Sequence, residues 1–349
     1  MQLDVWKITG AGFHFGRHGL DQEVSGVHLP SDSLFAALTA RLAALDGPQA
    51  AEAWGQAFIS GPPLVLSSAF PFAGEVRFFP TPLRTAASKR PENARPEHKD
   101  TRRVCFVSEG IFVRLLKGES LADVYDREHT LQDGQALYSP AEANRLPAAV
   151  QSEKKLWAVE QRPRVTVERE FARSALYFTG RTQFATGCGL WFAVRWAEHA
   201  ALSRESLARL LAELGDAGLG GERASGFGQA KIEPAGTLDL PEAAGQPWVT
   251  LSRYLPARQD TAALLDARAA FTIETVGGWA ESPGKPAERR RAVRMLAEGS
   301  VLGPLPGGIP GQMADVQPSY GGNQPLGHPV WRNGQALAVG FAPGALEGN

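Results

Sequence analysis

Cysteine, net charge and long apolar runs are all scarce in this chain. Its 349 residues include only Cys105 and Cys188, which excludes a disulfide framework and leaves no cysteine pair at the spacing of a zinc site. A net charge of −1, from 36 Lys and Arg against 37 Asp and Glu, argues against a globally basic nucleic-acid binder. No apolar run approaches the ~20 residues that cross a bilayer, and the chain opens on a strand pattern rather than a signal peptide. We therefore expect a cytoplasmic protein without a metal or other cofactor.

Glycine and proline, by contrast, are abundant, with 38 and 25 residues. Glycine at this level indicates positions of unusual backbone geometry or of close approach to a ligand. At roughly 150 residues per domain, the length fits two domains. Gly, Pro and acidic residues mark 234–247 as a linker, which predicts an N-terminal domain over 1–236 and a smaller C-terminal domain over 245–349.

The N-terminal domain alternates strand and helix patterns. Leucines recur at three- and four-residue steps after Ser31 and after Ser203, which predicts two amphipathic helices. Strands are predicted near 3–15, 64–66, 76–79, 163–169, 175–178, 189–194 and 231–232, with 64–66 and 76–79 forming a hairpin. This order is that of a split βαβ unit, so we expect an α+β, ferredoxin-like fold.

A segment over about 83–162 interrupts that order and is predicted to be a large insertion. Seven Lys and Arg residues crowd between 84 and 103, among few large apolar side chains. A solvated loop and a binding arm are both compatible with such a tract.

The C-terminal domain is predicted to be α+β as well. Strand patterns cover 248–254, 270–276, 292–301 and 335–341, and 262–266 is weakly helical. Gly and Pro are so frequent over 303–327 that a long loop is expected there. The basic cluster Lys285, Arg289, Arg290, Arg291 and Arg294 is compatible with contact to RNA, contact to an acidic protein, or a solvated face.

The most informative segment is a glycine-rich loop over 218–228. It holds five glycines in eleven residues, with Arg223 and Ser225 between them. Such a loop is expected to leave backbone N–H groups free for an anion, and Arg223 could contact a phosphate. A Rossmann or P-loop site is excluded, because a helix precedes this loop and a strand follows it. A tight helix-to-strand connection is the structural alternative.

In this position the loop resembles the signature loop of the RAMP proteins of CRISPR systems. Four further segments are similar to the type III-A subunit that caps the 5′ end of crRNA. They are 31–38, 163–169, 295–300 and 328–334, and they occur in order along nearly the whole chain. The basic tract over 84–103 is the least matched part.

This resemblance implies a non-catalytic, RNA-binding subunit of the Csm interference complex in antiviral defence. Such a subunit grips the crRNA 5′ handle, docks the large polymerase-like subunit and contacts the neighbouring RAMP backbone subunit. It also implies two ferredoxin-like (RRM-like) domains, the first with its insertion acting as a thumb between handle and guide. The residues thereby assigned to RNA are Gly218, Gly220, Gly221, Arg223, Ser225, Gly226, Phe227, Gly228, Arg164, Arg169, His28, Ser31, Lys154 and Lys155.

Catalysis is the main alternative, because related RAMP ribonucleases that process precursor crRNA use a histidine near the first helix. His28 occupies such a position, but it also fits a packing or RNA-contacting residue, and acid–base cleavage needs a second positioned group. Asp32 is predicted to cap the first helix rather than to cut RNA. The equivalent type III-B subunit and a scaffold that contacts only protein also stay open.

The near-zero net charge hides an uneven distribution. Acidic residues gather over 119–128 and 239–242, whereas Lys and Arg concentrate in the insertion and over 285–294. We therefore predict a subunit with one RNA face and several protein-facing sides. It should bind RNA weakly alone and retain it strongly once assembled.

Overall fold

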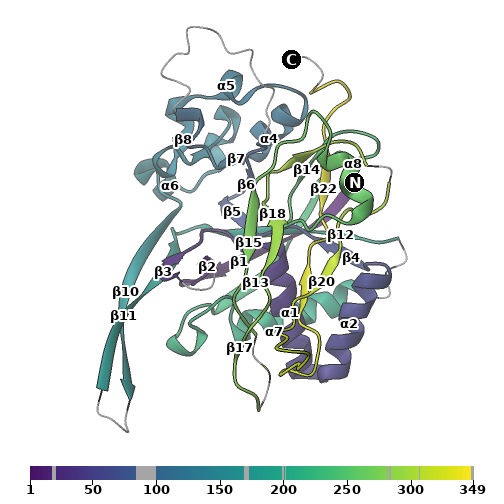
Figure 1. Ribbon diagram of the computed structural model, residues 1–349. Coiled ribbons are helices and arrows are strands. Elements are labelled where there is room, and N and C mark those ends of the chain that lie inside the picture. The colour runs from purple at the N-terminus through teal and green to yellow at the C-terminus, as the bar shows by residue number, and fades with distance from the viewer. Residues whose placement is uncertain are drawn as a thin grey trace.

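The computed structural model describes residues 1–17, 21–83, 100–168, 173–198, 200, 202–280, 282, 284–305 and 307–346. Within them, a nine-stranded sheet has the order β13-β1-β12-β5-β6-β7-β9-β8, with β4 also paired to β12. Figure 1 shows α1, α2 and α7 together on one side of this sheet, and a long β-ribbon that projects from the body.

The middle of the sheet follows the predicted split βαβ order. The central strand β1 (Gln2–Gly10) is antiparallel to both β12 (Cys188–Trp196) and β13 (Ala230–Asp239). Helix α7 (Arg204–Ala217) connects β12 to β13, and its leucine face is buried as predicted. Helix α1 (Ser31–Asp46) lies between β1 and β12 along the chain, and its leucine face is buried at Leu34 and Leu38 but exposed at Leu45. The strand and helix periodicities therefore predicted this part correctly.

The predicted hairpin of 64–66 with 76–79 is wrong. Strand β4 (Leu64–Leu66) pairs with β12, and the hairpin joins β5 (Phe70–Ala73) to β6 (Val76–Pro80) through Gly74 at φ 60°. Helix α2 (Pro48–Ser60) was not predicted. Gly47 and Pro48 end one helix and begin the next, because proline at the first helical position loses no hydrogen bond.

The chain after β6 extends the sheet and adds small helices. Its strands are β7 (Phe106–Ser108), β8 (Thr130–Leu131) and β9 (Ala136–Leu137), and its α-helices are α4 (Glu109–Leu116), α5 (Leu121–Val124) and α6 (Ala148–Glu153). Three 3-10 helices lie between them: η1 (Arg127–His129), η2 (Gln132–Gly134) and η3 (Pro140–Arg145). Most of the basic tract, 84–99, lies outside the described residues.

The projecting ribbon consists of β10 (Trp157–Glu168) and β11 (Arg173–Phe184), which pair only with each other as a sheet. Strands predicted at 163–169 and 175–178 are therefore found, but not in the main sheet, which continues only at β12. At its base the ribbon meets the small hairpin of β2 (Gly16–Arg17) and β3 (Asp21–Ser25). A backbone bridge between Phe13 and Thr182 ties it to the chain after β1.

Strand β13 runs to Asp239, into the predicted linker. It is the outermost strand beside β1, where Pro234 can be accommodated because an edge strand need not donate every N–H. The register shifts between Asp4 and Trp6, beside that proline.

The C-terminal part is built from short strand pairs. A three-stranded sheet joins β14 (Trp248–Thr250), β19 (Val301–Leu302) and β22 (Ala338–Gly340). The two-stranded pairs are β15 (Ile273–Val276) with β18 (Val293–Leu296), β16 (Trp279–Ala280) with β17 (Glu288–Arg289), and β20 (Met313–Asp315) with β21 (Trp331–Asn333). In the described residues from 245 onward, the helices are η5 (Arg258–Asp260) and the four-residue α8 (Thr261–Leu264). Two helices packed on a four-stranded sheet are not found there, so a second ferredoxin-like domain stays a prediction.

The main hydrophobic core crosses the boundary between the two parts. It contains the apolar faces of β1, β12, α1 and α7 together with Val249, Leu251 and Phe341. A smaller cluster surrounds Trp248 and Tyr254. The C-terminal part is thus packed against the N-terminal part through shared apolar burial. None of the described helices is long and apolar enough to cross a membrane.

Candidate nucleic-acid interface

The glycine-rich loop connects α7 to β13 and lies against residues 10–15, the chain that follows β1. Gly220 has φ 87°, and a Cβ there would lie 2.4 Å from the carbonyl oxygen of His14. A Cβ at Gly228, also at φ 87°, would lie 2.3 Å from the carbonyl oxygen of Leu219. These two glycines are therefore required by the close backbone packing and the left-handed conformation, independently of any ligand.

Most backbone N–H groups of the loop are already used inside the protein. The bonded ones are those of Gly218, Leu219, Gly221, Ser225, Gly226, Phe227 and Gly228. Two of these bonds fix the loop to the neighbouring chain, from Gly221 N–H to His14 O at 2.9 Å and from Gly228 N–H to Gly12 O at 2.9 Å. Few N–H groups of the loop therefore remain for an anion, and side chains must supply most of any anion contact.

Two arginines of the ribbon enclose the aromatic ring of the loop. The guanidinium carbons of Arg164 and Arg181 lie 5.1 and 5.6 Å from the centroid of the buried Phe227 ring. Arg164 Nη2 donates to Ser225 O at 3.3 Å, and Arg181 Nη2 donates to Ala11 O at 2.7 Å. The Nε atoms of both arginines are buried without a hydrogen-bond partner. Each guanidinium carries five N–H groups, so both arginines retain N–H donors that can bind a ligand.

Arg223 completes a basic surface that we call the glycine-loop face, made of Arg164, Arg181 and the loop 218–228. Its side chain is exposed in the 3-10 turn η4 (Arg223–Ser225), and no ion pair to it is found among the described residues. Glu222 is the one carboxylate of the loop, and its Oε2 accepts a hydrogen bond from the Ser225 hydroxyl at 3.2 Å. The face is therefore net positive, which suits a phosphate backbone.

Arg181 and His14 belong to this face and were missed from the sequence. His14 is buried, with its Nδ1 2.7 Å from Gly180 O, so it joins the ribbon to the floor of the loop. A Cβ at Gly12 would lie 2.3 Å from Arg181 Nε. The interruption of the first strand by Gly10 and Gly12 was the available signal, because glycine marks close approach.

Two predicted RNA contacts, His28 and Ser31, instead belong to a buried group at the boundary of the two parts. Ser31 is 4% exposed, its N–H donates to Ser68 Oγ at 2.8 Å, and its own Oγ accepts from Arg253 N–H at 3.0 Å. His28 Nε2 lies 3.7 Å from Glu298 Oε2, and its ring stacks on Phe70. These contacts face the C-terminal part, so Ser31 offers no free group to a ligand.

Ion pairs hold that group together, and we call it the junction network. It comprises His28, Ser31, Asp32, Ser68, Arg253, Glu298 and Arg332. Arg253 Nη2 is 3.7 Å from Glu298 Oε2, and Ser68 Oγ donates to Glu298 Oε1 at 2.5 Å. Burial alone would raise the pKa of Glu298, but Arg253, His28 and the Ser68 hydroxyl outweigh it and hold that pKa well below its usual range.

Asp32 was expected to cap α1, and this is wrong. The N-cap position is Pro30, and Asp32 Oδ2 instead forms a buried ion pair with Arg332 Nη1 at 3.2 Å. Burial lowers the pKa of Arg332, although Asp32 opposes the shift.

Among the described residues, no cluster of three or more His, Cys, Asp or Glu side chains could hold a metal ion.

The remaining predicted residues do not join the glycine-loop face. Lys154 Nζ lies 5.6 Å from the centroid of the Tyr138 ring, and Lys155 forms an ion pair with Asp133. They precede the start of β10 at Trp157, from which Arg164 is separated by roughly 23 Å of extended strand. Arg169 lies outside the described residues.

Comparison with known proteins now bears on this arrangement. Residues 243–341 match the family model of the CRISPR Csm4 C-terminal domain. The CRISPR system Cms protein Csm4 of Thermococcus onnurineus is 26% identical over 282 residues, covering 80% of this chain and 83% of that protein. The protein of the same description from Mycobacterium tuberculosis (strain H37Rv) is 28% identical over 320 residues, covering 90% of each. This chain is thus similar to Csm4 proteins over most of its length.

Solved structures of similar fold are also found. A chain in the crystal structure of a Csm3–Csm4 subcomplex of the type III-A CRISPR-Cas interference complex matches with a TM-score of 0.61 and 18% identity, covering 98% of this chain and 100% of that one. A chain of a Csm1–Csm4 cassette in complex with pppApA matches with a TM-score of 0.54 and 19% identity, covering 98% of each. At these identities the likeness concerns the fold.

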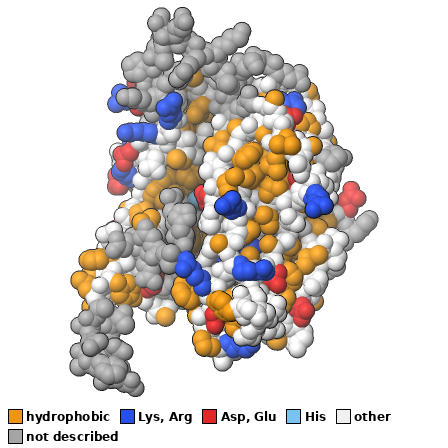
Figure 2. Space-filling model, in the orientation of Figure 1, with side chains coloured by type: hydrophobic (Ala, Val, Ile, Leu, Met, Phe, Trp, Pro, Cys, Tyr) orange, Lys and Arg blue, Asp and Glu red, His pale blue; other side chains and the backbone are white. Residues whose placement is uncertain are grey.

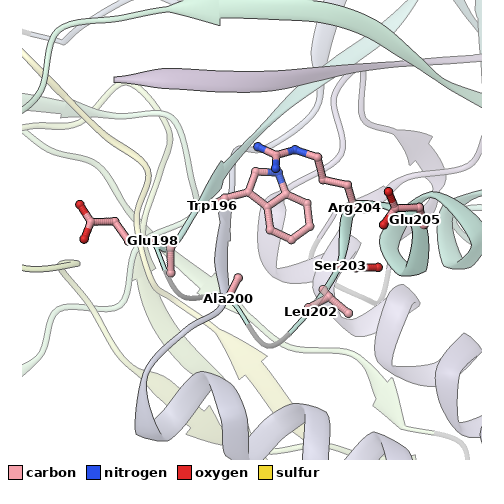
Figure 3. A pocket seen from close by; sticks show the side chains of 8 residues that line it. Trp196, Glu198, Ala200, Leu202, Ser203, Arg204 and Glu205 are labelled. Carbon is pink, nitrogen blue, oxygen red and sulfur yellow. The ribbon is translucent and has the colours of Figure 1, made fainter.

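One small pocket lies at the start of α7, away from the loop, and Figure 3 shows its lining. The Arg204 guanidinium lies over the Trp196 ring, 5.2 Å from its centroid. Asp4 Oδ2 accepts from both Trp196 Nε1 and Arg204 Nε at 2.7 Å. These contacts tie the end of β12 to the start of α7, and we assign the pocket a structural role.

Proposed function

We propose that this chain is a non-catalytic RNA-binding subunit of a type III-A CRISPR interference complex, and that its glycine-loop face grips the 5′ handle of crRNA. Similarity to Csm4 proteins supports the assignment to a type III complex. The matched structures contain Csm1 and Csm3, so we further propose the large subunit and a RAMP backbone subunit as its partners. The proposed location is the cytoplasm.

The observation that carries the RNA-binding role is the placement of Arg164 and Arg181 over Phe227, in the same loop as the exposed Arg223. Guanidinium groups bind phosphate oxygens through charge-assisted, two-pronged hydrogen bonds. Single-stranded RNA offers such phosphates along its whole length, together with 2′-hydroxyls and unstacked bases. Hydrogen bonds to Ser225 O and Ala11 O hold Arg164 and Arg181 in place, and the backbone contacts of Gly220 and Gly228 fix the loop that carries Arg223. Cations held in place before binding favour one path of the RNA backbone.

The ribbon β10–β11 is the proposed thumb between handle and guide, in place of the helical segment before it. One of its faces carries Val165 opposite Leu176 and Pro163 opposite Phe178. Val165 and Leu176 are 58% and 64% exposed, which is unusual for large apolar side chains on a projecting element. Such side chains can stack against or separate bases.

We also propose the finer description of the fold. The N-terminal ferredoxin-like domain covers 1–236 and the C-terminal part covers 245–349 as a reduced relative of the same fold. The start of the family match at residue 243 supports this division. The shared core explains why the two parts would not separate readily.

Absence of catalysis is part of the proposal. His28 is the histidine nearest to α1, and its ionisable neighbour Glu298 is already engaged by Ser68 and Arg253. An acid–base mechanism needs two groups that are free to exchange protons with the RNA. This geometry favours a packing role for His28.

Filter binding of a handle RNA by the purified complex tests the RNA-binding role. We expect Arg223→Ala and Arg164→Ala each to weaken handle retention about 10-fold or more, the scale of a lost charge-assisted contact. Gly221→Glu should do the same, because it adds negative charge beside His14, 2.9 Å from the added Cβ. Arg209→Ala, an exposed arginine on the outer side of α7, is the matched control. Unchanged retention in all three loop and ribbon variants would refute the proposed role.

Incubation of the isolated chain with repeat RNA in the presence of EDTA tests the enzymatic alternative. We expect intact RNA with both the unmodified chain and His28→Ala. Cutting by the unmodified chain that disappears in His28→Ala would establish a precursor-processing ribonuclease instead.

A further inference from the structure

A second basic and aromatic surface lies on the C-terminal part, on the strand pairs β15–β18 and β16–β17. Trp279 stands directly opposite Arg289, and Thr275 stands directly opposite Arg294. Trp279 is 56% exposed, and both arginines are exposed. An indole this open is uncommon on a protein surface and marks a candidate contact.

The register places each arginine beside the residue opposite it, Arg294 beside Thr275 and Arg289 beside Trp279. Gly277 and Gly278 separate the two strand pairs along the chain. We call this surface the Trp279 face, made of Ile273, Thr275, Trp279, Arg289 and Arg294. Figure 2 shows Lys and Arg side chains interspersed with apolar ones over the side of the molecule where β15 and β18 lie.

The basic side chains of this region fall into two groups, those that hydrogen-bond to backbone carbonyls of the protein and those that do not. Arg290 Nε donates to Gly277 O at 2.8 Å, Arg291 Nη2 donates to Asp315 O at 2.6 Å, and Lys285 Nζ donates to Leu326 O at 2.6 Å. These three fix the ribbon to itself and to the loop after β20. Arg289 and Arg294 have no ion-pair or hydrogen-bond partner of their side chains within the part of the chain that the structure describes. Their charge is therefore available to a ligand.

The acidic groups nearby do not neutralise this face. Glu288 stands opposite Ala280, on the other side of the strand pair, and accepts a hydrogen bond from the Tyr320 hydroxyl at 3.3 Å. Glu274 lies on the opposite side of β15 from Thr275 and pairs with Arg253 at 2.9 Å. The Trp279 face thus combines an open aromatic ring with two unneutralised guanidinium groups.

We propose that the Trp279 face binds single-stranded RNA, with a base stacked on the Trp279 indole and neighbouring phosphates held by Arg289 and Arg294. Every base has a face that can stack on an aromatic ring, so such a surface accepts RNA of any sequence. An acidic peptide would use the two cations but gain little from the open indole. The combination therefore favours RNA over an acidic protein. This surface is separate from the glycine-loop face and does not require the handle.

Binding of a fluorescein-labelled oligouridylate without handle sequence to the full-length chain tests the proposal. We expect Trp279→Ala to weaken binding roughly 5- to 150-fold, the range for loss of one stacked base, whereas Trp279→Phe retains most of the affinity. In Arg289→Gln/Arg294→Gln, the slope of log affinity against log salt should fall by about 1.4, for two phosphate contacts. Arg258→Gln, an exposed arginine of η5, is the matched control and should leave both quantities unchanged.

Three results would overturn the proposal. The first is unchanged oligouridylate binding in Trp279→Ala, and the second is an equal loss in Arg258→Gln. The third is binding of polyglutamate that depends on Arg289 and Arg294 without oligouridylate binding, which would establish a protein-docking surface. Arg223→Ala separates this proposal from the handle role, because it should reduce retention of handle RNA and leave oligouridylate binding at the Trp279 face intact.

Discussion

The glycine-loop face and the junction network are made of similar residue types but differ in burial and pairing. Arginines of the loop face lie over an aromatic ring and reach solvent, with Arg223 fully open. Arginines of the junction are buried and paired, Arg332 with Asp32 and Arg253 with Glu298 and Glu274. A guanidinium with an open side can bind a ligand, whereas a buried pair fixes the position of two chain segments. Residue type alone therefore does not separate a binding site from a structural contact.

The largest expected effect is at the junction. Arg332→Ala should lower the free energy of unfolding by about 3–5 kcal/mol, because it leaves the Asp32 carboxylate buried without its partner. Urea denaturation followed by circular dichroism measures this. Asp32→Asn in the same background should restore part of the loss, since it removes the uncompensated charge. A loss below 1 kcal/mol in Arg332→Ala would contradict a structural role for the pair.

The next effect concerns the packing of the glycine loop. Gly220→Ala should destabilise the protein by about 2–4 kcal/mol, because the left-handed φ and a Cβ 2.4 Å from His14 O act together. Gly226→Ala is a matched control at φ 83° with no atom within 4 Å of its Cβ, and should cost only about 1 kcal/mol. Equal losses in the two variants, measured by thermal unfolding, would show that close packing is not what requires glycine at position 220.

A smaller effect is expected from pH at the junction. The pKa of Glu298 is lower in the folded protein than in the unfolded chain, so its stabilisation is complete above the ordinary Glu value of about 4.3 and is lost as pH falls below it. One such proton contributes at most about 1.4 kcal/mol per pH unit to the slope. Glu298→Gln should therefore flatten the fall in stability between pH 4 and pH 3, whereas Glu52→Gln, at an exposed glutamate of α2, should not. Parallel curves for Glu298→Gln and the unmodified chain would argue against the coupling.

The smallest stability effect is predicted at the open arginine. Arg223→Ala should change the free energy of unfolding by less than about 0.5 kcal/mol, as is usual for exposed side chains, while it weakens handle retention in the complex. Circular dichroism melts and filter binding on the same preparation measure both quantities. A large loss of stability would show that Arg223 stabilises the fold, as the arginines of the junction network do, and the difference between the glycine-loop face and the junction network would no longer hold.

Part of the fold was predictable because it rests on local periodicity. The leucine stripes of α1 and α7 and the alternation in β1 gave the helices, the strands and their order along the chain. Strand partners were not predictable in the same way. Leu64–Leu66 fits either a hairpin with 76–79 or an edge against β12, and only the packing of the whole sheet decides between them.

The candidate site shows the same limit. The loop with Arg223 was found from its glycine spacing and its resemblance to the RAMP signature loop. Arg164 was found from the segment 163–169, which resembles the type III-A subunit. Arg181 was missed, because its approach to Phe227 depends on the pairing of β10 with β11. Ser31 and His28 were assigned to RNA, since nothing local to their segment reveals Arg253, Glu298 and Arg332, which lie more than 200 residues away.

The sequence by itself determined the apolar periodicities, the glycine-rich segment over 218–228, and an overall charge near zero. Tertiary structure decided which cations stay open and which are buried in pairs. The physical reason is that the free energy of a charged side chain depends on its solvent and its partners, and both are set by segments far apart along the chain. Arg223 and Arg332 are alike as residues, and only the fold makes one a candidate ligand for RNA and the other half of a buried ion pair.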